Sequence, residues 1–357
     1  MSKQRRVGPL LSIDHVVSFL DRTLLSLPGA ALLAGYSFYK SRGLSRDINI
    51  SQILSHLYQH RSLAGLLAFV ALRAVNGALG RLVANHGWRR DRPVWSFEKG
   101  KGDVVLVTGG ATGIGKQVVD MLASKTDKIA VLDVAEPVKA AENVKYYKCD
   151  VSDSAAVAEV AQLIRAEIGH PTVILNVAGI VRGSTLLDTT SQQLALTLNI
   201  NIVGVHNVIR EFLPHIVSIN HGHVMTMSSS GAYLSVPQLG AYAASKAGVL
   251  AYHEVLVEEL AHRYNASTSA PPLMPTLSAK AVAQGIVTIV ESGLSAQWTP
   301  PFFAGFALPA VRAMPLWMKW LLVKSGGATE FVSKSSAEVH VKSYKLIHEL
   351  DAAHQAK

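Results

Sequence analysis

The chain is poor in cysteine and in charged residues. One cysteine among 357 residues, Cys149, excludes an intramolecular disulfide and a cysteine-based metal cluster, and it fits a reducing compartment. Charged residues make up 17% of the chain, below the roughly 25% that is usual for a soluble domain. Hydrophobic residues make up 49%, enough to offset the entropy of ordering, so intrinsic disorder is excluded.

Acidic residues are scarce in the first quarter of the chain. Residues 1–98 hold 13 Lys and Arg against 5 Asp and Glu, whereas the remainder is nearly balanced. The basic residues are interleaved with apolar runs and form no exposed stripe, so nucleic acid is not expected as a partner. An anionic membrane surface fits this mixture better.

The apolar runs of this region are shorter than a membrane crossing requires. Residues 23–39 form an uncharged run of 17 and residues 62–72 a shorter one, whereas a spanning helix needs about 20. Trp88 and Trp95 stand among arginines, as in an interfacial anchor. Residues 1–98 are therefore predicted to be a membrane-associating helical region, as a hairpin or as helices in the membrane plane. Two buried helices of a water-soluble cap are the alternative.

Residues 99–295 alternate short β-branched runs with helical patterns, which is typical of an α/β fold with a doubly wound parallel sheet. The predicted strands are residues 103–107, 129–132, 144–147, 172–175 and 223–227. The predicted helices are residues 114–124, 154–168, a long region within 192–219, and 242–264. Residues 296–357 are predicted to be an amphipathic extension, which serves as an interfacial helix, a lid over a pocket or a dimer contact.

A glycine-rich turn follows the first predicted strand directly. It reads Thr108-Gly109-Gly110-Ala111-Thr112-Gly113-Ile114-Gly115 and runs into a helical pattern. Gly109 permits a tight turn, Gly113 lets backbone amides approach a pyrophosphate, and Gly115 lets the helix pack close to the strand. Unpaired N–H groups at the helix start, around Thr112 and Ile114, then meet the phosphates. The turn therefore predicts a Rossmann-type dinucleotide site.

Three polar residues follow the next predicted strands. Asp133 ends the second strand, where a carboxylate accepts the ribose hydroxyls of NAD and repels the 2′-phosphate of NADP. A solvated turn residue is the alternative reading. Asp150 and Asn176 follow the third and fourth strands, at the edge where open α/β sheets bind ligands. NAD is therefore the predicted cofactor and NADP is disfavoured, and no metal site is predicted.

A candidate group for proton transfer lies further along the chain. Tyr242 and Lys246 are four residues apart, on one face of a predicted helix. A cation one turn away favours the ionised phenol and brings its pKa toward a useful range. Ser229 follows the fifth predicted strand, where its hydroxyl can donate to a substrate oxygen that gains charge. By spacing alone, Ser228 and Ser230 are alternatives.

Taken together, these motifs resemble those of the short-chain dehydrogenase/reductase family over about residues 100–295. The motifs are the glycine turn, the segment Asn176-Val177-Ala178-Gly179, Asn201, Ser229, and Tyr242 with Lys246. The apolar N-terminal extension, Asp133 and residues 211–215 resemble the membrane-associated branch that contains retinol and 17β-hydroxysteroid dehydrogenases. This resemblance implies a membrane of the endoplasmic reticulum or a lipid droplet, with the catalytic domain facing the cytosol.

The resemblance also implies a role for each matching residue. Tyr242 would pass the proton to or from the substrate oxygen, and Ser229 would orient that oxygen. Lys246 would hold the nicotinamide ribose and lower the pKa of the tyrosine. Asn201 would hold a water in the proton relay, with Asn199 and Asn207 as decoys. In the cofactor site, Asp150 would face the adenine and Asn176 would close the central strand.

One segment departs from the family pattern. The family has a sixth strand after the Tyr-Lys helix, followed by a loop over the substrate. Residues 265–278 contain no β-branched run, and their three prolines oppose a central strand. The sixth strand and the following loop are therefore predicted to be missing.

The sequence thus predicts a membrane-associated NAD-dependent oxidoreductase that acts on a hydrophobic alcohol or ketone, such as a retinoid, a steroid or a lipid alcohol. A membrane-bound scaffold that binds nucleotide without turnover is one alternative, favoured by the departure at 265–278. An NADPH-dependent carbonyl reductase of the same fold is another. The expected partners are the hydrophobic substrate, a membrane or lipid-droplet surface, and a second copy of the chain.

Overall fold

The computed structural model describes residues 23, 25–42, 49–84, 102–136, 141–264, 272–273, 279–292, 310, 312–315 and 318. The described elements form two compact units, one with the N-terminal helices and one with a sheet and its covering helices. The predicted boundary at residue 98 lies outside the described residues and stays a prediction.

The sheet is parallel along the strands that the structure describes. Their bounds are β1 Val104–Thr108, β2 Lys128–Asp133, β3 Val144–Lys148, β4 Val173–Asn176, β5 His223–Met227 and β6 Pro272–Leu273. They lie in the order β3-β2-β1-β4-β5-β6. β1, β4 and β5 are buried along their whole length, as expected for apolar strands covered on both faces. The five strands predicted from the sequence are confirmed to within one residue at each end.

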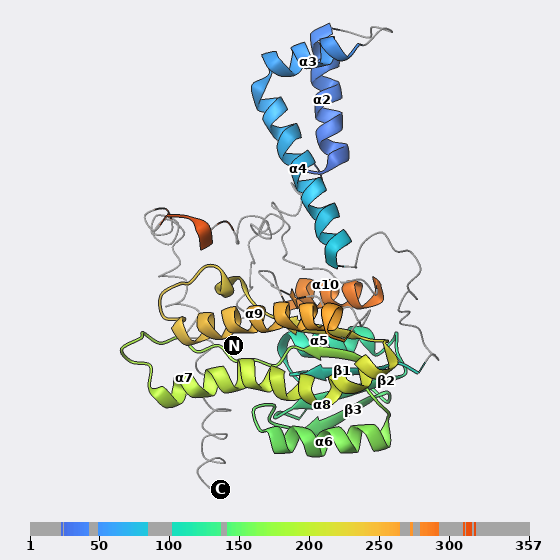
Figure 1. The fold of residues 1–357 in the computed structure, drawn as a ribbon, viewed down its shortest axis with the longest axis vertical. Coiled ribbons are helices and arrows are strands. Elements are labelled where there is room, and N and C mark those ends of the chain that lie inside the picture. Colours follow the sequence, from blue (N-terminus) through green and yellow to red (C-terminus); the bar gives the residue numbers. More distant parts are fainter. Residues whose placement is uncertain are drawn as a thin grey trace, which may run out of the picture. The chain divides into compact units, whose positions relative to one another are not determined.

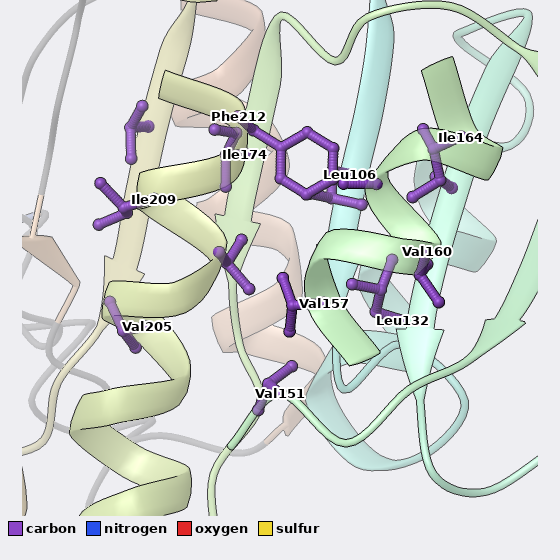
Figure 2. Close-up of a cluster of buried hydrophobic side chains, with 14 of the residues drawn as sticks. Leu106, Leu132, Val151, Val157, Val160, Ile164, Ile174, Val205, Ile209 and Phe212 are labelled. Carbon is purple, nitrogen blue, oxygen red and sulfur yellow. The ribbon is translucent and has the colours of Figure 1, made fainter. Parts of the chain in front are cut away.

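Helices cover both faces of this sheet. Their bounds are α5 Gly113–Leu122, α6 Ser154–Glu167, α7 Ser191–Leu198, α8 Gly204–Ile219, α9 Gly240–His262 and α10 Ala279–Ser292. Side chains of α6, α8 and α9 pack on one face, and those of α5 and α10 on the other. Figure 1 shows the ribbons of these helices around the strands. Figure 2 shows the first of these two layers, where Val157 and Ile164 of α6 and Phe212 of α8 lie over Leu106 and Ile174 of the strands. Burial of each such side chain contributes about 1.5–3 kcal/mol to the stability of the fold. This packing holds the strands, and therefore their carboxyl ends, in place.

The structure contains a sixth strand, β6, at residues 272 and 273. The prediction that this strand is missing is therefore wrong. Pro272 and Leu273 pair with Thr226 and Met227 of β5 in parallel register. β6 is the last strand in the order of the sheet, and a proline is tolerated on such an edge because its missing N–H need not join a ladder. The predicted loss of the loop concerns residues 274–278, which lie outside the described part of the chain.

The strand order reverses between β1 and β4. From β1 the chain adds β2 and β3 on one side, and then β4 and β5 on the other. Open α/β sheets bind ligands at such a switch point, outside the carboxyl ends of the strands. The glycine turn after β1 and the segment after β4 lie at this position.

The other unit contains α2 (Leu27–Arg42), α3 (Ile50–Gln59) and α4 (Arg61–Ala84). His56 of α3 is buried, and its ring nitrogens contact the hydroxyls of Ser37 and Ser41 of α2 at 3.0 and 3.3 Å. On α4, Arg73 donates to the carbonyl oxygen of Leu25 at 3.1 Å. These polar contacts tie α3 and α4 to α2 and to the residues just before it.

Each of these three helices exposes apolar side chains at helical spacing. They are Leu32, Tyr36 and Tyr39 on α2, Ile50, Ile53, Leu54 and Tyr58 on α3, and Leu72, Val75 and Leu79 on α4. Within the described ranges, no helix has both the length and the hydropathy that a membrane crossing demands. The helical prediction for this region is confirmed for α2 to α4, and its association with a membrane stays a prediction.

The predicted C-terminal extension falls mostly outside the described residues. Of its described part, Arg312 donates to the carbonyl oxygen of Ala232 at 3.3 Å. The interfacial helix, the lid and the dimer contact stay alternative predictions for this extension.

Candidate active site

The glycine turn between β1 and α5 has no room for side chains at two of its glycines. Gly109 has a φ of +68°, and a Cβ there would lie 2.8 Å from the Cα of Ala178. A Cβ at Gly115 would lie 2.1 Å from the carbonyl oxygen of Gly109. A glycine at 109 therefore lets the turn lie this close to the segment after β4, and a glycine at 115 lets the start of α5 lie this close to the turn itself.

The amino end of α5 presents uncapped backbone N–H groups. Thr112 is the N-cap residue, and its side chain makes no capping hydrogen bond. The first N–H groups of the helix thus remain available to an anion. Asp133 at the end of β2 supports the turn, because its Oδ2 accepts from the N–H of Ala111 at 2.9 Å and its Oδ1 from that of Ala135 at 3.1 Å.

A cavity of about 570 Å³ runs from this turn across the carboxyl ends of the strands. Most of the predicted site residues line it: Gly109, Thr112, Gly113, Ile114, Gly115, Asp133, Asp150, Ser229, Tyr242 and Lys246. Further walls come from Ile180, Val181, Leu196 and Ile200. Asn176 and Asn201 were also predicted for the site but are not among the lining residues.

Lys246 lies in the wall of this cavity with little exposure to water. Its Nζ donates to the carbonyl oxygen of Met227 at 2.9 Å and lies 5.9 Å from the centroid of the Tyr242 ring. The side chain is 5% exposed, and burial lowers its pKa from 10.5 to about 8. The predicted placement of Tyr242 and Lys246 on one face of a helix is thus observed in α9.

The predicted effect of Lys246 on the pKa of Tyr242 is not observed. Burial raises the pKa of the phenol above its usual value of 10, and a hydrogen bond with Ser229 lowers it only in part. The ammonium group of Lys246 is directed to a backbone carbonyl. In the chain alone, Tyr242 is therefore a protonated phenol at neutral pH.

Of the three adjacent serines, the structure brings Ser229 to the phenol. The oxygen of Ser229 accepts from the N–H of Gly231 at 3.1 Å, which fixes the hydroxyl beside Tyr242. Ser228 is buried and donates to the carbonyl oxygen of Lys246 at 2.9 Å. Ser230 is not among the residues that line the cavity.

Asn201 lies in a π-helical turn, Asn199–Val203, between α7 and α8. It is fully buried, its Oδ1 accepts from the N–H of Ile180 at 2.8 Å, and its Nδ2 donates to the carbonyl oxygen of Ile180 and to Ser245 Oγ, both at 2.9 Å. Both amide hydrogens are used, so the side chain has no donor left for the predicted water. Of the two decoys, Asn199 is exposed and Asn207 donates to the carbonyl oxygen of Val151.

Asn176 at the end of β4 is 2% exposed, and neither polar atom of its side chain has a hydrogen-bond partner among the described residues. Such an unsatisfied buried amide is uncommon, because it costs free energy on folding. It lies next in the chain to Val177, Ala178 and Gly179, all of which line the cavity.

The residues present fit a dinucleotide cofactor. Such a ligand needs space for its pyrophosphate, which the absence of side chains at Gly109 and Gly115 provides. It also needs free N–H groups for the phosphates and an acceptor for the ribose hydroxyls, which the uncapped start of α5 and the carboxylate of Asp133 supply. Asp150 also lines the cavity, although its Oδ1 accepts from the backbone N–H and the hydroxyl of Ser152 at 2.9 and 2.7 Å.

Sequence reasoning missed three contributors. The hydroxyl of Ser245 and the backbone N–H of Ile180 each form a hydrogen bond with the side chain of Asn201. The hydroxyl of Thr108 accepts from the N–H groups of Val177 and Ala178 at 3.1 Å each. Ser245 could have been identified from the sequence, since it stands between Tyr242 and Lys246 on the same helix. The backbone of Ile180 carries no signal in the sequence.

The comparisons with known proteins agree with this geometry. A family model described as short chain dehydrogenase matches residues 103–285. The chain is 37% identical over 200 residues to Dehydrogenase RED2 of Cochliobolus heterostrophus, covering 55% of this chain and 74% of that protein. It is 31% identical over 169 residues to human Estradiol 17-beta-dehydrogenase 11 and 29% over 168 residues to human 17-beta-hydroxysteroid dehydrogenase 13. These matches cover 45% and 44% of this chain, and 56% of each human protein.

Solved structures of similar fold give the same result. A metagenomic short-chain oxidoreductase in complex with NADP is 23% identical with a TM-score of 0.51, over 58% of this chain and 99% of that one. A short-chain dehydrogenase from Streptomyces avermitilis is 21% identical with a TM-score of 0.52, over 63% and 99%. At these identities the likeness concerns the fold.

Proposed function

The chain belongs to the short-chain dehydrogenase family, and on this basis we propose that it transfers a hydride between NAD(H) and a hydrophobic alcohol or ketone. One observation carries the proposal. Tyr242, Ser229 and Lys246 share a single cavity with a glycine turn and a helix terminus suited to a dinucleotide.

The side chains of the cavity divide the work of proton transfer. Ser229 donates a hydrogen bond to the substrate oxygen, where negative charge develops. Tyr242, beside it, gives its proton to that oxygen in reduction and takes one from it in oxidation. Lys246, in the wall of the same cavity, would hold the ribose next to the nicotinamide and would favour the phenolate once the tyrosine ionises. When bound, the nicotinamide supplies or accepts the hydride.

NAD is proposed over NADP because of Asp133. Its carboxylate lies in the cavity wall beside the glycine turn, where it would accept hydrogen bonds from the adenosine ribose and would repel a 2′-phosphate. Initial rates with the two cofactors test this point. Equal rates, or faster turnover with NADP, contradict the assignment and favour the alternative, an NADPH-dependent carbonyl reductase.

The substrate is proposed to be hydrophobic, such as a retinoid, a steroid or a lipid alcohol. The cavity walls at Ile180, Val181, Leu196 and Ile200 are apolar, and Val181 is 44% exposed at the edge of the cavity. Two human relatives are named for steroid oxidation, which supports this class without identifying a compound.

A membrane or lipid-droplet surface is proposed as the place of action. The exposed apolar side chains of α2, α3 and α4 support it, since surfaces of this kind mark contact with another apolar phase. A substrate that dissolves poorly in water would then reach the enzyme from the lipid. The proposed membranes are those of the endoplasmic reticulum and of lipid droplets, with the catalytic unit in the cytosol.

The decisive experiment is purification of the full chain in detergent, followed by measurement of NADH formation across a panel of retinols, sterols and fatty alcohols. We expect turnover of at least one class and its loss in Tyr242→Phe. Turnover that survives in this variant would contradict the assigned role.

A scaffold that binds the nucleotide without turnover is the second candidate. The observation in its favour is that, in the part of the chain that the structure describes, β6 pairs with β5 over two residues. Calorimetric binding of NADH, together with no turnover of any substrate in the panel, would support this candidate over the enzyme.

A second copy of the chain is the remaining proposed partner. Val255 and Tyr264 are 57% and 46% exposed, and they share a groove with Leu213 and Pro214 of α8. An exposed apolar surface of this kind supports association of two chains. Light scattering in detergent measures the mass, and a single chain would contradict the proposal.

A further inference from the structure

Ser245 joins α9, the helix that carries Tyr242 and Lys246, to the π-helical turn through a side-chain hydrogen bond with Asn201. It is fully buried in α9, three residues after Tyr242 and one before Lys246. Its hydroxyl donates to the carbonyl oxygen of Tyr242 at 2.7 Å and accepts from Asn201 Nδ2 at 2.9 Å. Both hydrogen-bonding roles of the hydroxyl are therefore used.

The contact continues from Asn201 to the opposite wall of the cavity. Asn201 holds both backbone groups of Ile180, with its Oδ1 accepting at 2.8 Å and its Nδ2 donating at 2.9 Å. Ile180 itself lines the cavity. Asn201 is the buried residue of the π-helical turn, a kind of element that is frequent at functional sites.

The same wall is anchored to the glycine turn. The N–H groups of Val177 and Ala178 donate to the hydroxyl of Thr108, the last residue of β1, at 3.1 Å each. A continuous set of hydrogen bonds and short backbone steps thus runs from the start of the cofactor cradle, through Ile180 and Asn201, to Tyr242.

We propose that Ser245 is a positioning residue, which sets the phenol of Tyr242 against the cavity wall at Ile180. The proposal rests on the proposed function, since Tyr242 is the proton-transfer group there. A displaced phenol would still lie in the cavity but would meet the substrate oxygen at the wrong distance. Loss of the Ser245 hydroxyl should therefore lower kcat and leave cofactor binding through the glycine turn unchanged.

A serine in a helix often bonds the carbonyl of an earlier turn with no further role. Ser218 of α8 provides this matched case, because its hydroxyl donates to the carbonyl oxygen of His215 at 2.8 Å at an exposed position. Ser245 differs by the second bond, from a residue 44 positions away in the chain. Ser218→Ala is therefore the control.

The kinetic test compares Ser245→Ala and Ser245→Cys with the wild-type chain. We expect kcat to fall on the order of tenfold in Ser245→Ala, with the dissociation constant of NADH within about twofold. A thiol is similar in shape to a hydroxyl but forms weaker hydrogen bonds, so the kcat of Ser245→Cys should lie between those of the wild-type chain and Ser245→Ala. An unchanged kcat, or a parallel loss of NADH binding, overturns the proposal.

Hydrogen exchange tests the set of contacts without turnover. In the cofactor-free chain, Ser245→Ala should speed exchange of the Ile180 amide, which donates to Asn201, and Ser218→Ala should not. Unchanged exchange in Ser245→Ala overturns the proposal. If the wild-type chain turns over no substrate while exchange changes as expected, the proposed function fails and the structural link stands.

Discussion

Burial disfavours the charged form of both Lys246 and Tyr242. Burial lowers the pKa of the lysine to about 8 and raises that of the tyrosine. At neutral pH the chain alone therefore holds a protonated phenol, which is ready to donate, beside an ammonium group that is poorly solvated. Reduction of a ketone uses this state directly, whereas oxidation of an alcohol first needs the phenol to ionise.

This difference predicts opposite pH profiles for the two directions. Oxidation should become faster from about pH 7 to 10, because the fraction of phenolate at Tyr242 increases, and reduction should become slower. Tyr242→Phe should lower both rates by about 10²- to 10⁴-fold. Tyr252→Phe is the control, since its hydroxyl contacts His206 outside the cavity. An oxidation rate that is independent of pH would contradict the role of Tyr242.

Substitution of Lys246 should separate activity from stability. Lys246→Met should abolish turnover but raise the free energy of unfolding of the cofactor-free chain at pH 7 by up to about 3 kcal/mol. The folded-state pKa is below the unfolded one, so the wild type carries the full penalty below about pH 8 and loses it between about 8 and 10.5. The gain should therefore disappear at alkaline pH. Urea unfolding at pH 7 and pH 10 measures it, and a loss of stability at pH 7 would be contrary evidence.

At the scale of the elements, the glycine turn is the least tolerant part of the site. Gly115→Ala should remove NADH binding and lower the free energy of unfolding by about 1–3 kcal/mol, because the new Cβ meets the carbonyl oxygen of Gly109 at 2.1 Å. Gly65→Ala on α4, where a Cβ meets nothing within 4 Å, should leave binding intact. Thermal unfolding measures the change in stability, and NADH fluorescence measures cofactor binding. Normal NADH binding by Gly115→Ala would disprove the assignment of the turn.

The elements also show what a sequence can and cannot predict. Strands such as β1 and β5 were predictable because short apolar runs are typical of strands buried on both faces. The partnership of Tyr242 with Lys246 followed from helical spacing. The pKa of Tyr242 did not, since burial depends on the whole fold. The bond between Ser245 and Asn201 joins residues 44 apart and has no local pattern. β6 was missed because two residues of pairing leave no periodicity to detect.

At the scale of the whole molecule, the proposed place of action depends on the exposed apolar surface of α2 to α4. A variant with Leu72→Gln, Val75→Gln and Leu79→Gln should bind anionic vesicles at least roughly tenfold more weakly, since apolar area on α4 is lost. Leu163→Gln on α6, which is 46% exposed in the other unit, is the control. Flotation of the full chain with vesicles measures binding. Equal flotation of the α4 variant and the wild type would count against membrane contact through this surface.

Helices α9 and α10 pack on opposite faces of the sheet. The chain between these helices contains Pro272 and Leu273, which pair with β5 at the edge of the sheet. α10 has its own attachment, through apolar contacts with the sheet and the ion pair of Lys125 with Glu291. Length variation between the two helices would therefore widen or narrow the sheet at this border and leave both helices anchored. Variants that change only the length of this connection should bind NADH equally well and differ in their half-life at elevated temperature.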